Sequence, residues 1–191
     1  LKLDEPILEF RVFKYKVFTL ATILGMIVFA SMIATTVILP LYMQNMLGFN
    51  AFHSGLMLLP GAIVMGFMNP ITGTLFDKYG AKWLLQIGFT ILTLTTFMFT
   101  NLSADTTFTY LAILNAARMF SISMIMMPAT TLGLNQLPFD LIPHGTAMNN
   151  TFRQVAGSVG TAALVTVMVT GASSDQSLEG AIHGVNMSFI V

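Results

Sequence analysis

Five apolar segments, each long enough to cross a lipid bilayer as a helix, constrain the fold of this chain more than any other feature. A transmembrane helix needs about 20 mostly apolar residues. The segments are Val17–Met43, Ser54–Leu75, Trp83–Thr100, Phe108–Leu134 and Gly145–Thr170, and a sixth begins near Ala181. They are rich in Leu, Met, Ala and Phe and lack the alternation of a strand. The sequence predicts an all-α, polytopic bundle of transmembrane helices.

The composition supports a membrane location. Hydrophobic residues make up 55% of the chain and charged residues 8%, whereas a soluble domain carries about 25% charged residues. Lipid is therefore the expected partner of most of the surface. Zero net charge and the lack of a basic run argue against nucleic acid as a partner. There is no cysteine, and His53, His144 and His183 fall near helix ends on different sides, so we expect no metal centre, cofactor or catalytic site.

The connections between the segments are short, which predicts antiparallel neighbours in a single domain. We expect residues 1–16 to form a cytoplasmic juxtamembrane lead-in. Residues 17–191 form the transmembrane domain, with five full spans and the start of a sixth. The chain begins without an initiator methionine and ends a few residues into the sixth run, so both ends look cut. The sequence is interpreted as part of a longer protein.

The distribution of Lys and Arg predicts the orientation. The basic residues outside the apolar segments are Lys2, Arg11, Lys14, Lys16, Lys78 and Lys82. If the spans alternate, all six lie on one side, and the connections on the other side carry none. Positive residues favour the cytoplasmic side. We therefore expect the N-terminal end in the cytoplasm.

The second connection, Gly73–Lys82, reads GTLFDKYGAK. Gly73 would allow close helix approach, and Gly80 would permit a tight turn. Asp77 is expected to cap the third helix, and Lys78 and Lys82 to hold the connection at the cytoplasmic surface. A hairpin with basic residues and a capping Asp, without further function, is the alternative reading.

This decapeptide resembles the G-x-L-a-D-r-x-G-x-k loop of the major facilitator superfamily, which joins the second and third helices of a six-helix half. The surroundings are similar to the EmrB/QacA type of fourteen-span drug:proton antiporters. Supporting segments are Leu39–Gln44, Leu58–Gly61, Asn69–Pro70, Asn149–Gln154 and Gly157–Gly160. The resemblance implies an incomplete six-helix C-terminal half of that fold, with Gly73, Asp77, Lys78, Gly80 and Lys82 as a conformational-switch loop. One departure is at Arg118, where the Gln and Gly of an R-x-x-Q-G motif are missing.

Two arginines lie inside predicted spans. At a rise of about 1.5 Å per residue, Arg118 lies about 15 Å from the start of its predicted span. Arg153 lies about 12 Å from the start of its own span. A central arginine costs about 2.5–3.5 kcal/mol to insert, so it should face protein or water. Asn115 shares a face with Arg118, and Asn149 shares one with Arg153. We expect both pairs to point inward and line a transport path; arginines bonded to backbone carbonyls are the alternative.

Small residues continue the stripe that begins at Asn149 and Arg153. Gly157 follows at the same helical spacing, and Gly160 lies one turn beyond it, which suits close helix packing. In contrast, no Asp or Glu lies within any span. A proton-carrying acid would then belong to an N-terminal half outside this chain.

These observations, with the resemblance, predict a secondary active transporter rather than an enzyme. The expected function is proton-coupled efflux of small amphipathic drugs by alternating access, in a bacterial inner membrane. A metabolite exporter or importer on the same fold is one alternative. A membrane-embedded enzyme or a pore subunit is another, although no convergent catalytic cluster is seen.

Overall fold

The computed structural model describes residues 9–172 and 178–190, and this part of the chain is a bundle of helices without a strand. Five long helices match the predicted spans, which confirms the fold class. The long helices are α1 (Lys16–Asn45), α2 (Ala51–Tyr79), α3 (Ala81–Phe99), α4 (Phe108–Leu134) and α5 (Ile142–Ala172). Shorter elements are η1 (Phe10–Lys14), η2 (Phe139–Leu141) and α6 (Leu178–Ile190).

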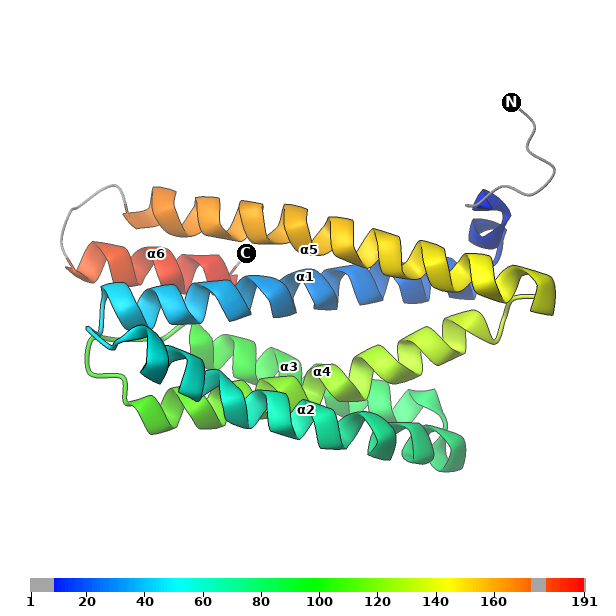
Figure 1. The fold of residues 1–191 in the computed structure, drawn as a ribbon, viewed down its shortest axis with the longest axis horizontal. Coiled ribbons are helices and arrows are strands. Elements are labelled where there is room, and N and C mark those ends of the chain that lie inside the picture. The colour runs from blue at the N-terminus through cyan, green and yellow to red at the C-terminus, as the bar shows by residue number, and fades with distance from the viewer. Residues whose placement is uncertain (1–8, 173–177, 191) are drawn as a thin grey trace.

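Successive long helices run in opposite directions along the bundle (Figure 1). The 3-10 helix η1, the turn between α2 and α3, and the connection between α4 and α5 lie at one end. The α1–α2 and α3–α4 connections lie at the other end. The basic residues of η1 and those beside the α2–α3 turn therefore share one end of the bundle. This is the arrangement expected if the basic residues outside the spans all lie on one side of the membrane.

Helix α4 is the centre of the bundle. Of the residues in its most apolar stretch, 61% are buried, whereas in each of the other long helices this share is 28% or less. It packs against α1, α2 and α3, while α5 packs against α1 and α6. Apolar side chains of the other helices remain widely exposed, as expected where lipid is the solvent. The polar residues Asn115, Arg118, Ser121 and Ser123 of α4 are consequently buried.

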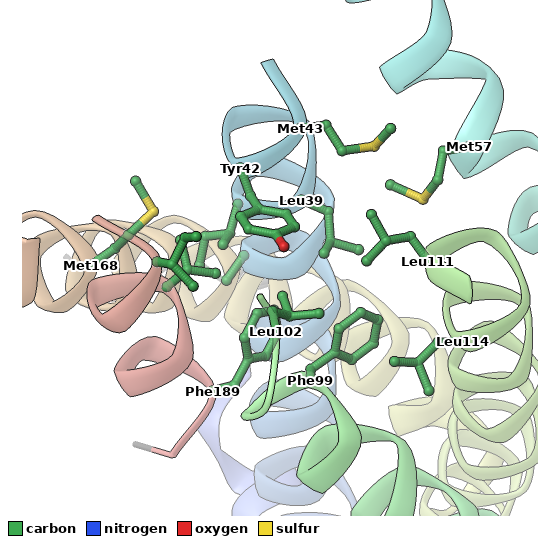
Figure 2. Close-up of a cluster of buried hydrophobic side chains, with 14 of the residues drawn as sticks. Leu39, Tyr42, Met43, Met57, Phe99, Leu102, Leu111, Leu114, Met168 and Phe189 are labelled. Atoms are coloured by element: carbon green, nitrogen blue, oxygen red, sulfur yellow. The ribbon is translucent and has the colours of Figure 1, made fainter. Parts of the chain in front are cut away.

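The largest apolar cluster fills the end of the bundle where α1, α3, α4 and α6 meet (Figure 2). The rings of Phe99 and Phe189 stack with their centroids 5.0 Å apart. Polar contacts fasten the α3–α4 connection to this cluster: Tyr42 Oη donates to Ser103 O at 2.6 Å. The Asn186 side chain accepts from Leu102 N at 3.1 Å and donates to Leu102 O at 3.0 Å. These bonds tie α6 to a connection far from it in sequence.

The lead-in folds back onto the opposite end of the bundle. Val12 is fully buried in a cluster with Leu141 and Met148. The rings of Phe13 and Phe152 meet edge to face at 5.4 Å. Residues 1–8, the rest of the predicted lead-in, lie outside the described residues. The lead-in is therefore packed against α5, a contact that the sequence did not predict.

Candidate functional site

A buried guanidinium in the middle of α4 is the most unusual feature of the bundle. Arg118 is 1% exposed. Its Nη1 donates to Thr96 Oγ1 on α3 at 2.6 Å, and its Nη2 donates to Ser31 Oγ on α1. Its Cζ lies 5.8 Å from the centre of the Phe99 ring, within cation–π range. One cation thus joins three helices, and its polar partners are neutral hydroxyls, not backbone carbonyls.

A cavity of about 420 Å³ opens beside this guanidinium, between α1, α3, α4, α5 and α6. The polar groups of its wall come from Ser31, Thr35, Thr96 and Ser188, in addition to Arg118. Ile27, Leu164 and Phe189 are among the apolar residues of the wall. Ser188 and Ile190, at the described end of α6, form one side of this wall. The sequence alone gave no indication that these hydroxyls converge.

Asn115 is also buried on α4, but the structure does not bring its side chain to the same place. Its amide lies against Gly61 of α2: a Cβ at Gly61 would stand 2.5 Å from Asn115 Nδ2. Neither Nδ2 nor Oδ1 has a hydrogen-bond partner among the described residues. Asn115 and Arg118 are therefore both inward, as expected, but they reach different neighbours, and a role for Asn115 in a transport path stays a prediction.

Arg153 on α5 occupies a different level of the bundle from Arg118. Its Nη2 donates to Thr130 Oγ1 at 3.1 Å and contacts Met126 Sδ at 3.4 Å, both on α4. The closest approach on α1 is Gly25, where a Cβ would lie 3.3 Å from Arg153 Nε. Because Thr130 lies about three turns beyond Arg118 on α4, the two arginines do not share one site. Asn149, one turn before Arg153, is 4% exposed.

The two predicted packing glycines lie at the α1–α5 contact. A Cβ at Gly160 would stand 2.6 Å from Ala30 Cβ, and one at Gly157 would stand 3.0 Å from Phe29 Cε1. At Gly160 the distance is too short for an additional carbon, and Ala30 Cβ is fixed to the backbone, so the helices could not keep this separation; at Gly157 the Phe29 ring would have to shift. The glycines therefore set how closely α5 approaches the helix that carries Ser31.

The connection at Gly73–Lys82 differs from the expectation. Helix α2 continues to Tyr79 and α3 begins at Ala81, so Gly80 alone joins them, with φ +75° and ψ 174°. The expected tight turn at Gly80 is present. Asp77 was expected to cap α3, and this is wrong: it lies in the last turn of α2, and no side chain caps α3. The reason is that no helix breaker follows the predicted end of α2 before Gly80.

The other side chains of this connection are mostly at the surface. Asp77, Lys78, Gly80 and Lys82 are exposed, and Lys78 Nζ lies 5.2 Å from the centre of the Tyr79 ring. The structure shows no hydrogen bond to the Asp77 carboxylate from residues 9–172 or 178–190. Gly73, in contrast, faces another helix, since a Cβ there would lie 3.1 Å from Met127 Cε on α4. The proposed switch role of these residues stays a prediction.

Several polar residues of the interior were missed by sequence reasoning. Ser31, Thr96 and Thr130 receive the arginine donors, and Ser123 Oγ donates to Asn69 Oδ1 at 2.8 Å between α4 and α2. Hydroxyl residues within a helix often bond their own backbone, as Thr95 does. Their presence in a span therefore does not indicate a partner. No group of three His, Asp or Glu in the described ranges is placed to hold a metal ion.

Comparison with known families decides the identity. Residues 2–161 match the family model of the Major Facilitator Superfamily. The chain belongs to the Major Facilitator Superfamily. This membership and the five apolar helices identify it as an integral membrane protein. The resemblance noted in the Gly73–Lys82 segment is thereby confirmed at the level of the family.

Relatives within the superfamily include proteins named for drug resistance. The chain is 52% identical over its whole length to the uncharacterized MFS-type transporter YcnB of Bacillus subtilis. It is 45% identical over 90% of its length to the lincomycin resistance protein LmrB of Listeria innocua. It is 26% identical over 83% of its length to the multidrug export protein EmrB of Haemophilus influenzae. The chain spans 41%, 36% and 31% of these relatives, respectively.

Proposed function

We propose that this chain is the major part of one half of a secondary transporter that exports small amphipathic drugs in exchange for protons. The observation that carries the proposal is the buried Arg118 in the middle of a superfamily bundle. Charged groups inside a membrane bundle are costly and mark substrate or ion pathways. Relatives named for lincomycin resistance and multidrug export support drug-like substrates.

The mechanism that we propose is alternating access. In transporters built from two halves, substrates bind near the bilayer midplane and the halves rock around the site. We expect the second half in the part of the longer relatives that this chain does not cover, and we assign it to their N-terminal region. No acid lies in the predicted spans of this chain, so the proton-carrying group is assigned to that half. A bacterial inner membrane is the proposed location.

The first test is efflux by the full-length parent protein. Cells that express it are loaded with ethidium or lincomycin, and retention is followed with and without a protonophore. We expect extrusion that collapses when the protonophore dissipates the proton gradient. Extrusion that persists without a gradient would remove the coupling to protons. Extrusion of a metabolite with no extrusion of either drug would favour the alternative, a metabolite carrier on the same fold.

Replacement of Asp77 by asparagine is expected to reduce ethidium efflux at least tenfold without changing the thermal unfolding temperature of the parent. The carboxylate is exposed and bonds nothing in the described structure, so the loss of its charge should not affect the folded bundle. Asp105→Asn is the matched control, because Asp105 is also exposed but belongs to the α3–α4 connection, which lies at the opposite end of the bundle (Figure 1). Equal effects of the two substitutions would contradict a switch role for Asp77.

The proposed orientation is tested by labelling single cysteines. This chain has no cysteine, so Tyr79→Cys and Ala104→Cys in a cysteine-free parent report the two ends of the bundle. In intact cells, an impermeant maleimide should label residue 104 and not residue 79, and inverted vesicles should give the reverse. Labelling of residue 79 from outside would overturn the cytoplasmic assignment of the basic end.

A further inference from the structure

Three buried polar atoms at one level of the α1–α5 contact have no hydrogen-bond partner among the residues that the structure describes. They are Thr22 Oγ1 on α1, and Asn149 Oδ1 and Arg153 Nε on α5. Thr22 is 1% exposed and Asn149 is 4% exposed, so solvent at the surface does not reach these groups. A buried donor or acceptor that lacks a partner is strongly destabilising. Each of the three atoms therefore requires a partner inside the bundle.

The register of the two helices brings these atoms together. Helices α1 and α5 run in the same direction (Figure 1), and Gly25 lies opposite Arg153, since a Cβ at Gly25 would stand 3.3 Å from Arg153 Nε. Thr22 precedes Gly25 by about one turn, and Asn149 precedes Arg153 by about one turn. Side chains of a helix tilt toward its N-terminus, so Arg153 extends toward the level of Asn149. Thr22, Asn149 and the Nε atom therefore lie on facing sides of one small region.

Aromatic side chains of α1 close this region in both directions along the helices. On the side of η1, a Cβ at Gly145 would lie 3.3 Å from Phe18 Cε2. On the other side, a Cβ at Gly157 would lie 3.0 Å from Phe29 Cε1. Both walls are formed by residues of α1 and α5 themselves. The polar level is therefore enclosed between two apolar contacts.

The hydroxyl of Thr22 departs from the pattern of the other threonines in these helices. Elsewhere the hydroxyl commonly donates to the carbonyl four residues earlier in its own helix, as in Thr35, Thr95, Thr130 and Thr146. Thr22 Oγ1 makes no such bond. A threonine hydroxyl that does not bond its own backbone is available to a partner between the helices.

One water molecule matches the hydrogen-bonding capacity of all three atoms. Water donates two hydrogen bonds and accepts two. Arg153 Nε can only donate, Asn149 Oδ1 can only accept, and the Thr22 hydroxyl can do either. A metal cation would be repelled by the guanidinium, and an anion would be repelled by the Asn149 oxygen. Buried waters in proteins typically make about three hydrogen bonds, which is the number of partners offered here.

We propose that one water molecule binds between Thr22, Asn149 and Arg153 Nε, and that it fixes the guanidinium that fastens α5 to α4. Arg153 Nη2 donates to Thr130 Oγ1 on α4 at 3.1 Å. The side chain crosses α1 at Gly25, which has no Cβ to obstruct it. The water holds the Nε side of the same guanidinium, so the network joins three helices. Such a network is needed whether or not the parent protein transports drugs.

The direct test is a density map of the full-length parent in lipid nanodiscs, at a resolution that shows ordered water. We expect one peak within about 3.2 Å of Thr22 Oγ1, Asn149 Oδ1 and Arg153 Nε. A map that shows ordered water elsewhere in the protein but none here would overturn the proposal. A direct hydrogen bond between Thr22 and Asn149, or between Thr22 Oγ1 and the Phe18 carbonyl, would also overturn it.

The sign of the stability change in Thr22→Val is a second test. If water binds the hydroxyl, valine releases the water and leaves Asn149 Oδ1 and Arg153 Nε unpaired. The equilibrium constant for unfolding of the parent in mixed micelles should then rise about tenfold. If the hydroxyl is unpaired, valine removes a buried polar group that has no partner, and this constant should stay the same or fall. That result would contradict the proposal.

Asn149→Leu completes a double-mutant cycle with Thr22→Val. Alone it should raise the unfolding constant about tenfold. Added to Thr22→Val it should raise the constant less than about threefold, because the first substitution has already released the water. Effects that multiply fully would contradict a shared water. Thr35→Val is the control, since Thr35 is also buried on α1 but bonds Ser31 O of its own helix at 2.8 Å; its effect should multiply independently with that of Asn149→Leu.

Discussion

Replacement of Arg118 by leucine is expected to reduce efflux by the parent protein at least tenfold without lowering its stability. The guanidinium is held by two hydroxyls and an aromatic ring, and nothing in the described structure neutralises it. Inserting an arginine at the bilayer centre costs about 2.5–3.5 kcal/mol. Leucine removes this cost, and replacing buried charges by apolar residues is often neutral or stabilising. Serine and threonine hydroxyls left behind can bond their own helices.

The measurements are ethidium efflux in cells and the thermal unfolding temperature of the purified parent. Met119→Leu is the matched control, because Met119 is the next residue of α4 and is also buried. It should change neither quantity appreciably. If Arg118 were purely structural, Arg118→Leu would lower the unfolding temperature while transport by the remaining folded protein persisted. That pattern would contradict a transport role for the residue.

Replacement of Gly160 by leucine should disrupt the bundle itself. A Cβ at this position would stand 2.6 Å from Ala30 Cβ and 3.4 Å from Ala30 Cα, so even the first added carbon has no space. Forcing extra carbons into a packed contact costs about 1–3 kcal/mol, and here the backbone of α1 would have to move. We expect a loss of about 2 kcal/mol or more in the free energy of unfolding, measured in mixed micelles.

Gly66→Leu is the control for this substitution. Gly66 lies in the interior of α2, and a Cβ there would meet nothing within 4 Å in the described structure. Leucine is a better helix former than glycine by about 1 kcal/mol or less, so stability should be unchanged or slightly raised. Similar losses for Gly160→Leu and Gly66→Leu would show that the close α1–α5 contact does not determine stability.

The sequence predicted the parts of the structure that depend on length and hydropathy. Helices α1, α2, α4 and α5 contain the predicted spans completely, and α3 ends one residue before the predicted Thr100. These predictions succeed because a bilayer sets a minimum length for each apolar segment. The basic residues lie at one end of the bundle because successive spans run in opposite directions, as the sequence predicted.

The candidate site was predicted only in part, because its partners carry no local signal. The cost of a charge in lipid identifies Arg118 as an inward residue, and the structure places it there. However, the choice of Ser31 and Thr96 depends on how α1 and α3 pack around α4, which helical spacing does not encode. The cap predicted at Asp77 failed for a related reason. Whether Asp77 can cap α3 depends on where α2 ends, and hydropathy does not locate that boundary to within a few residues.

The most direct test of the transporter assignment uses the purified full-length parent in proteoliposomes. A pH gradient is imposed across the vesicle membrane, and ethidium movement and internal pH are recorded together. We expect ethidium to accumulate against its own gradient while protons leave the compartment that ethidium enters, and vesicles without the protein to show neither change. Ethidium that only equilibrates, with no effect of the pH gradient, would contradict a proton-coupled transporter.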